Sequence, residues 1–483
     1  MPGEAEINAA YDQGRSAVIA LLQETFLALA ERIQKLEDQL AKNSRNSGKP
    51  PSSDGYEKPA PKSRRTRSRK KSGGQVGHAG HTLEAVGKPD TIEIHEVSHC
   101  ANCQASLQSV PAIALEKRQV FDLPEVCIEV TEHQAEIKVC PSCQSQTKAA
   151  FPFGVSQPVQ YGNRIKSRMS YLHEYQLLPL GRVQETLQDF YGQNIAEGTI
   201  LSACEELAGQ VAPVQQAVKG HLTHKTDVAG FDETGIRVEG KLHWCHVACT
   251  DLLTYYEIHA KRGKMAMDEI GILPNFKGRA IHDDLPSYFQ YSIEHGLCNV
   301  HHLRSLEFLL ERYPQGQGWV KKLRDLLLEI KSAVEKAITK AKTRLPAKTL
   351  ANFSTRYDAL LKQGFKLNPA ERRPAQKPKR GRPKQSFARN LLLRLRDHKQ
   401  AVLTFMYDFK VPFDNNQAER DIRMLKVKQK VSGCFRSRRS ADIFCVIRSY
   451  ISMARKNGKS VLDVLSSAFN GNPFCPAFIS LPA

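Results

Sequence analysis

The sequence 228-VAGFDETGIRV-238 decides the fold of this chain. Apolar and polar residues alternate along it, and we interpret it as a strand, a tight turn and a second strand. Two strand-like stretches follow, 242-LHWCHVACT-250 and 254-TYYEIHAKR-262, each bounded by polar or glycine breaks. A helical stretch, 265-MAMDEIGIL-273, then precedes a buried strand in 278-GRAIHDDLPSY-288. These elements predict an α/β unit.

The order strand-strand-strand-helix-strand is that of a ribonuclease-H-like core. In that fold the first and fourth strands are neighbours. Asp232 lies on the first strand and Asp283 at the end of the fourth. We therefore expect two carboxylates that are far apart in the sequence to come close together, with a third acid supplied by a later helix.

The third acid is predicted in 412-PFDNNQAERDIRMLK-426. Asp414 is a plausible N-cap for a helix here, because its side chain can accept a hydrogen bond from the first turn. Apolar residues at helical spacing then form an inward-facing stripe, namely Ala418, Ile422 and Leu425. Glu419 falls on the neighbouring face, beside a series of basic residues.

Three clustered acids suit one kind of chemistry. Cleaving a phosphodiester, or attacking one with a 3′-hydroxyl, needs an activated oxygen and a stabilised leaving oxygen, and a pair of Mg²⁺ (or Mn²⁺) ions held by carboxylates supplies both. Simpler explanations remain open from the spacing alone. An aspartate at a strand end is often a turn residue, and Glu419 with Arg423 at i, i+4 is an ordinary surface pair.

The charge of the chain points to a polyanionic partner. The chain has 70 Lys and Arg residues and 50 Asp and Glu residues, so its net charge is +20. Such an excess of positive charge is typical of nucleic-acid-binding proteins. We predict DNA contacts from the residues beside Glu419, which are Arg420, Arg423, Lys426 and Lys430. Arg380 and Arg382, within Arg-Gly-Arg-Pro, match the core of an AT-hook that enters narrow minor grooves, although a solvated basic loop explains them as well.

Cysteines occur in two Cys-x-x-Cys pairs. Cys100 and Cys103 form one and Cys140 and Cys143 the other, with strand-like sequence between them. Each pair offers two thiolates at a spacing that suits a tetrahedral ion, so we predict a closed, structural Zn²⁺ site. A redox pair is the alternative.

The N-terminal region combines a helix with a polar segment. Apolar residues recur every three or four positions from Ile19 to Leu40, which predicts a coiled-coil seam, or else a helix packed on its own domain. The segment after Lys42 has almost no apolar residues and carries the block KSRRTRSRKK, which indicates a flexible basic linker. Near Gly192, two helical patterns around a turn predict a helix-turn-helix outline.

Over nearly its whole length the chain closely resembles transposases of the insertion sequence 66 family. The most specific matches are DNNQAERDIR (414–423) and SGCFRS (432–437), with HDDLPSYF, LCNVHHLR and GGQVGHAGHTL also in order. The resemblance implies a DDE-type DNA transposase with Asp232, Asp283 and Glu419 as its acids. It leaves open whether Asp283 or Asp284 faces the metal, and we prefer Asp283.

The resemblance has further implications. Cys298 and His301 match a Cys-x-x-His element of the family near the fifth strand, which we interpret as support for the site. The expected partners are DNA ends and target DNA, a second or further copies of the chain, and small accessory proteins of the same element. The alternatives are a catalytically inactive zinc-containing helix-turn-helix regulator and a ribonuclease-H-like nuclease that cuts without joining.

Together these patterns predict a multidomain α+β protein. We find no apolar run of about 18 residues and no secretory signal, so we expect no membrane partner and a cytoplasmic, nucleoid-associated location. The expected order is a coiled-coil helix (1–45), a flexible basic linker (46–85), a zinc-binding module (86–155), a helix-turn-helix-like helical region (156–222), the first part of the ribonuclease-H-like core (223–302), a helical insertion with a basic loop (303–400), the second part of the core with the glutamate helix (401–470), and a C-terminal tail (471–483).

Overall fold

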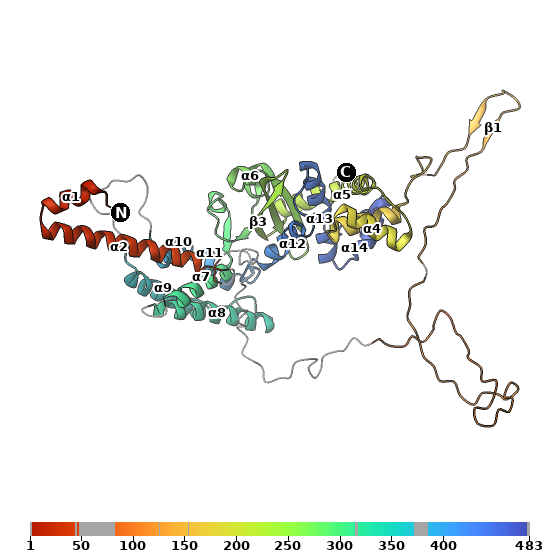
Figure 1. Cartoon of the computed structure of the whole chain (residues 1–483), viewed down its shortest axis with the longest axis horizontal. Helices are drawn as coiled ribbons and strands as arrows, with labels where there is room; N and C mark the ends of the chain where they lie inside the picture. The colour runs from red at the N-terminus through yellow and green to blue at the C-terminus, as the bar shows by residue number, and fades with distance from the viewer. Residues whose placement is uncertain are drawn as a thin grey trace. The chain divides into compact units, whose positions relative to one another are not determined.

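The computed structural model describes residues 2–43, 46–47, 83–124, 126–152, 154–313, 317–370 and 385–480. Most of the predicted basic linker, and both arginines of the AT-hook match, lie outside these residues. The described chain divides into two compact units, which we treat separately. The larger one holds residues 134–188 and 193–483 besides the N-terminal helices, and it contains the sheet shown in Figure 1.

Five strands form one mixed sheet in the order β5-β4-β3-β6-β7. Strand β4 is antiparallel to both β3 and β5, whereas β6 runs parallel to both β3 and β7. The strands are β3 (Val228–Val238), β4 (Lys241–Cys249), β5 (Thr254–His259), β6 (Arg279–His282) and β7 (Glu294–Leu297). The helix α6 (Lys264–Ile270) connects β5 to β6, so the predicted order of elements is confirmed.

One detail of the prediction is wrong: β3 is a single strand of 11 residues without an internal turn. Gly235 does not break it, because it pairs with Trp244 across the ladder and the Leu242 side chain covers the space that a Cβ would occupy. The turn comes later, at Glu239 and Gly240, whose φ angles of 52° and 74° lie in the left-handed region.

The two faces of the sheet carry different helices. Figure 1 shows α6 against β3 on one side and α12 (Asn416–Ser432) and α13 (Arg438–Lys456) on the other. Along β3, Ile236 and Val238 pack into the same buried cluster as Ala418 and Phe444. Alternation therefore turns the even-numbered residues of β3, Asp232 among them, toward α12.

β5 is an edge strand of the sheet, and side chains from neighbouring helices form hydrogen bonds with its backbone. The hydroxyl of Ser449 on α13 accepts from the Tyr256 N–H at 2.9 Å, and Gln215 and Arg438 donate to the carbonyls of Tyr256 and Ile258. Gln215 belongs to α5 (Glu197–His224), which packs against α13. Edge backbone groups are thus paired without another strand.

The predicted helix-turn-helix outline has its two helices. The first, α4 (Leu180–Tyr191), ends at Gly192 with a φ of 66°, and α5 follows after a short connection. The second helix is buried on several sides, between α3 (Asn163–Ser170), α13 and α14 (Val461–Phe469). A short π-helix, Tyr171–Tyr175, links α3 to α4. A DNA-binding role for this outline stays a prediction.

Helices separate β7 from α12 in the chain. Their buried core includes Trp319, Tyr357 and Leu392, and Gly364 has no room for a Cβ because Leu392 and Trp319 lie 2.6 and 3.0 Å from that position. The helices are α7 (Asn299–Arg312), α8 (Gly318–Thr339), α9 (Ala347–Leu367), α10 (Phe387–Asp397) and α11 (Lys399–Tyr407).

The N-terminal part consists of α1 (Glu4–Asp12) and α2 (Arg15–Leu40). The apolar seam of α2 is exposed: Phe26 is 67% and Ile33 56% accessible. Farther on, β1 (Ile137–Val139) and β2 (Gln146–Lys148) form a small antiparallel hairpin around the second cysteine pair. None of the helices in the described ranges has both the length and the apolarity to cross a bilayer.

A buried ion pair anchors α12 to α13. The Asp421 carboxylate lies 2.6 Å from the Lys456 Nζ, and their side chains are only 9% and 10% exposed. Lys456 also donates to the carbonyls of Thr250 and Leu253, and the Thr254 hydroxyl donates to Asp421. The pair therefore fixes the helix that carries Glu419 to the β4–β5 turn and to α13.

We expect Asp421→Ala to destabilise the core by about 3–5 kcal/mol, because it leaves the Lys456 ammonium buried without its partner. Urea unfolding of the full chain measures this free energy. The matched control is Glu335→Ala, which removes an exposed i, i+4 partner of Lys331 and should change stability by less than about 0.5 kcal/mol. Equal effects of the two substitutions would contradict the anchoring role.

Candidate active site

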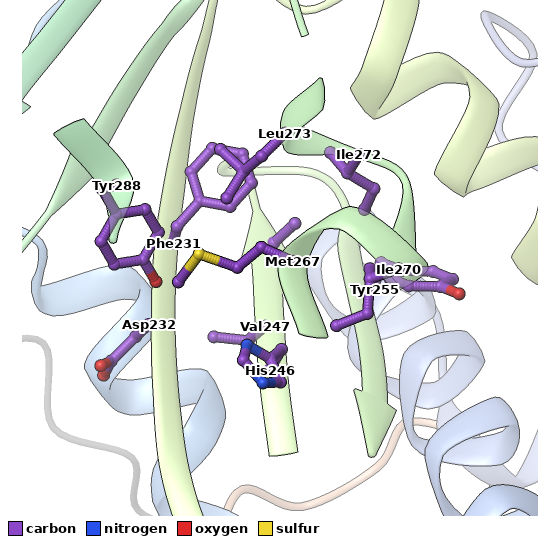
Figure 2. A pocket seen from close by; sticks show the side chains of 11 residues that line it. Phe231, Asp232, His246, Val247, Tyr255, Met267, Ile270, Ile272, Leu273 and Tyr288 are labelled. Atoms are coloured by element: carbon purple, nitrogen blue, oxygen red, sulfur yellow. The ribbon is translucent and has the colours of Figure 1, made fainter. Parts of the chain in front are cut away.

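Asp232 lies on the face of β3 that α12 covers. Its backbone pairs with Val247, and its carboxylate accepts a hydrogen bond from the Glu233 N–H at 2.8 Å. Figure 2 shows the other face, where Phe231 points into a small cavity beside Met267 and Asp232 points away from it. That cavity measures about 20 Å³, room for about one water molecule, so it is a packing void.

Asp283 follows directly after β6, the strand that pairs with β3. Ile281 is the register partner of Gly230, and alternation places Asp283 on the side that Ile281 and Asp232 share. Asp284 has a φ of 85°, which turns its side chain elsewhere, and its carboxylate forms an ion pair with Arg394. This geometry favours Asp283 over Asp284 as the acid that faces Asp232.

Glu419 lies in the first turn of α12, and Asn415 positions it. The Asn415 side chain donates to the Phe231 carbonyl on β3 at 2.8 Å, and its backbone N–H donates to the Cys298 sulfur at 3.2 Å. The Asn415 side-chain oxygen lies 2.7 Å from where a Cβ on Gly230 would be, so only glycine permits this approach.

The predicted N-cap is off by one residue. The helix begins at Asn416 with Asn415 in the N-cap position, because the Asn415 side chain is used to bind β3. Asp414 still contributes, since its carboxylate accepts from the Asn416 N–H at 3.0 Å.

Asp283 and Glu419 lie close enough to Asp232 for their charges to act on it. Burial raises the pKa of Asp232 well above its usual range, and the charges of Glu233, Asp283 and Glu419 raise it further. Among the described residues, neither Asp232 nor Asp283 has an ion-pair partner. The ligand atoms of the three acids do not form a group within 4.8 Å of one another in the described residues, but carboxylate oxygens are the donors that hard divalent ions such as Mg²⁺ prefer.

Glu233 is a carboxylate that the sequence analysis missed. Its side chain is fully buried, forms an ion pair with Arg262 at 2.7 Å and accepts from the Tyr288 hydroxyl at 2.7 Å. Arg262 in turn stacks on Trp244. Burial, with the nearby charge of Asp283, raises the pKa of Glu233. Because side chains alternate between the two faces along β3, Glu233 points to the opposite face of the sheet from Asp232, and the sequence could have indicated this.

Cys298 and His301 lie next to Glu419. Cys298 follows β7 directly and is the N-cap residue of α7, and His301 lies in the first turn of that helix. The His301 Nε2 is 3.8 Å from the Glu419 Oε1. The Cys298 sulfur is 4.0 Å from the same oxygen. Burial raises the pKa of the Cys298 thiol to about 12, so the thiol is neutral in the absence of an ion.

The predicted basic face of α12 is only partly exposed. Arg420, Arg423 and Lys430 face solvent. Lys426 departs from them: its ammonium donates to the Gly235 carbonyl at 2.6 Å, and burial lowers its pKa. Arg380 and Arg382 lie outside the described residues.

The two cysteine pairs have the same local backbone. In each, the carbonyl of the first cysteine accepts from a glutamine four residues on, Gln104 or Gln144, and both glutamines have φ near 60°. Backbone N–H groups, that of Cys103 first, lower the pKa of Cys100, and the Ser145 hydroxyl lowers that of Cys143. The pairs belong to different compact units, so the joint zinc site stays a prediction.

A mixed five-stranded sheet in this order is typical of ribonuclease-H-like cores, on which DDE-type nucleic-acid enzymes are built. The family model described as transposase IS66 family matches residues 158–443, more than half of the chain. The chain therefore belongs to the IS66 family of DDE-type transposases, whose activity is DNA transposition with a divalent metal. A family of unknown function matches residues 2–84. No curated protein matches the chain.

We expect Asp232→Asn to raise the Tm of the metal-free protein by about 2–4 °C, the shift that ~1 kcal/mol produces in a domain of about 150–250 residues. The substitution removes a buried charge from among like charges. It should also abolish the stabilisation that Mg²⁺ gives the wild type. Differential scanning fluorimetry tests both effects, with Asp251→Asn at the exposed β4–β5 turn as the control. A Mg²⁺ shift retained in Asp232→Asn would contradict the assignment.

Proposed function

We propose that this transposase binds the ends of its element, cleaves the DNA and joins the freed 3′-hydroxyls to target DNA. The observation that carries the proposal is that the charges of Asp283, just after β6, and of Glu419, on α12, both act on the buried Asp232 of β3. A DNA-binding regulator has no need of three mutually repelling carboxylates at one place.

Asp232, Asp283 and Glu419 are the proposed ligands of two catalytic Mg²⁺ (or Mn²⁺) ions. When bound, such ions activate the attacking oxygen and stabilise the leaving one. The protein contributes fixed positions: Asn415 holds the first turn of α12 on β3, and the Asp421–Lys456 pair holds its middle. Glu233, neutralised by Arg262, supports the strand from the opposite face.

The proposed DNA contacts are Arg420, Arg423 and Lys430. They are exposed on the helix that carries Glu419, so the residues that grip the phosphate backbone and the acid share one rigid element. Lys426 is held to β3 and would act by fixing α12 to the strand. Arg380 and Arg382 remain proposed minor-groove contacts on the strength of the sequence.

Zinc is proposed for the cysteine pairs. Each pair has the same local backbone turn, and hydrogen bonds that lower the pKa of Cys100 and Cys143 favour the thiolates that zinc requires. With four sulfur ligands such an ion has no open position, and its role would be structural.

The active form is proposed to be a homodimer or larger assembly in the cytoplasm, associated with the nucleoid. The exposed apolar seam of α2 supports a second copy as its partner, because a heptad stripe of this kind is normally buried between helices. Small accessory proteins of the same element are proposed as further partners.

We expect Glu419→Gln to reduce Mg²⁺-dependent strand transfer more than about 100-fold, beyond the 10–100-fold typical of residues that only support a metal ligand. The substitution keeps the shape of the side chain and removes its charge. The assay uses DNA with the terminal repeats of the element, and a gel-shift measurement checks that end binding is retained. The control is Glu335→Gln on the exposed face of α8.

Two results would contradict the proposed role of Glu419 or the proposed activity. Strand transfer at the wild-type level in Glu419→Gln would remove Glu419 from the site. A wild-type chain that binds ends without cleaving or joining them in Mg²⁺ or Mn²⁺ would favour the regulator.

We expect Ile33→Asp to convert the oligomer to a monomer of 54.2 kDa, because a charge would then lie in the apolar seam of α2. Multi-angle light scattering gives the mass directly. Gln23→Asp adds the same charge to α2 outside the seam and should leave the mass unchanged. A wild-type chain that is already monomeric at micromolar concentration would contradict the proposed pairing.

A further inference from the structure

Three different donor atoms meet beside the catalytic acids. The Cys298 Sγ, a ring nitrogen of His301 and a carboxylate oxygen of Glu419 all lie within 4.8 Å of one another. In the described part of the chain, they make up the single cluster of three or more such donors at this spacing. Sulfur and imidazole differ chemically from the carboxylates of Asp232 and Asp283, so the cluster calls for its own explanation.

The cluster is rigidly built and open to an ion. Cys298 is buried, and its sulfur accepts the Asn415 N–H at 3.2 Å. The side chains of His301 and Glu419 are 22% and 19% exposed, which leaves access from solvent. The three donors come from the starts of α7 and α12, two helices that are far apart in the sequence and held together here.

The distances suit a small tetrahedral cation. Bonds of about 2.3 Å to sulfur and about 2.0–2.2 Å to nitrogen and oxygen place tetrahedral donors about 3.4–3.6 Å apart. In the structure the sulfur and the nitrogen lie 4.0 and 3.8 Å from the Glu419 Oε1. Both of these distances exceed the tetrahedral spacing by a few tenths of an ångström, and the sulfur and the imidazole lie within 4.8 Å of each other, so side-chain rotation brings the three donors onto one ion.

We propose that Cys298, His301 and the Oε1 of Glu419 bind a thiophilic divalent cation, with Zn²⁺ as the best match, at a position distinct from the Mg²⁺ site and joined to it through Glu419. A thiolate and an imidazole select zinc over magnesium, which prefers oxygen donors. Three protein ligands leave a fourth position for water. Binding displaces the proton of the Cys298 thiol, so one proton is released for each ion bound.

Such an ion would tether the catalytic helix. It joins the first turn of α12 to the start of α7 through Oε1 and leaves the second carboxylate oxygen of Glu419 free to face the acids. This role in catalysis rests on the proposed function, whereas the binding of the cation does not.

The test is a Co²⁺ titration of the full-length chain with Ser at Cys100, Cys103, Cys140 and Cys143. Those replacements remove the predicted zinc pairs, and cobalt reports its ligands by colour. We expect one equivalent to bind with a sulfur-to-cobalt charge-transfer band and tetrahedral d–d bands. Zn²⁺ should displace it, and excess Mg²⁺ should not.

In the same background, Cys298→Ser should remove the charge-transfer band, and His301→Asn should weaken binding by at least about 10-fold. The control is Cys445→Ser, which alters another buried cysteine, on α13, and should leave the spectrum unchanged. The proposal is overturned if the band is absent or survives Cys298→Ser. Circular dichroism verifies folding. If Cys298→Ser does not fold, His301→Asn decides, and an unaltered titration in that variant overturns the proposal.

Failure of the metal site and failure of the proposed function give different results. A cobalt band without any strand transfer by the wild type keeps the cation site and removes the proposed activity. Strand transfer in Mg²⁺ without a cobalt band keeps the activity and removes the cation site.

Discussion

The docking of Asn415 between β3 and the β7–α7 junction is the contact on which the candidate site depends. Its side chain and backbone bind two elements at once, and Gly230 leaves the space that the contact needs. Glu419 follows one turn later, so its distance from the strand acids is set by this amide. Asn415 therefore fixes the start of α12 on β3, and this contact sets the position of Glu419 in the first turn of the helix.

Stability and chemistry conflict at the same place. Asp232, Glu233 and Asp283 crowd like charges into a buried region, and burial with mutual repulsion raises the pKa of the first two. Arg262 compensates Glu233 but lies on the other face of the sheet from Asp232. The buried Asp421–Lys456 pair and the apolar stripe of α12 hold the helix against that repulsion. The repulsion among the acids is therefore opposed by the buried ion pair and the apolar packing of α12.

Much of this could be predicted from the sequence because alternation and helical spacing are local signals. They located the strands of the core, the helix that carries Glu419, its buried stripe and the helical insertion. They failed where tertiary contacts decide. The sequence predicted a turn at Gly235, but the Leu242 side chain packs over this glycine within a continuous strand. It predicted Asp414 as the N-cap, but Asn415, whose side chain binds the Phe231 carbonyl, holds that position. Lys426 looked like a surface cation, but it donates to Gly235. Spacing within one segment cannot reveal a partner almost two hundred residues away.

The order of elements also has a consequence for synthesis. Asp232 lies on β3 and Asp283 just after β6, whereas Glu419 arrives only after the helices of the insertion, and Lys456, which secures its helix, comes later still. A chain still on the ribosome, or one cut short within the insertion, carries two acids and no third. The order of the chain thereby delays assembly of the three acids until α12 and the segment that holds Lys456 have both been synthesised.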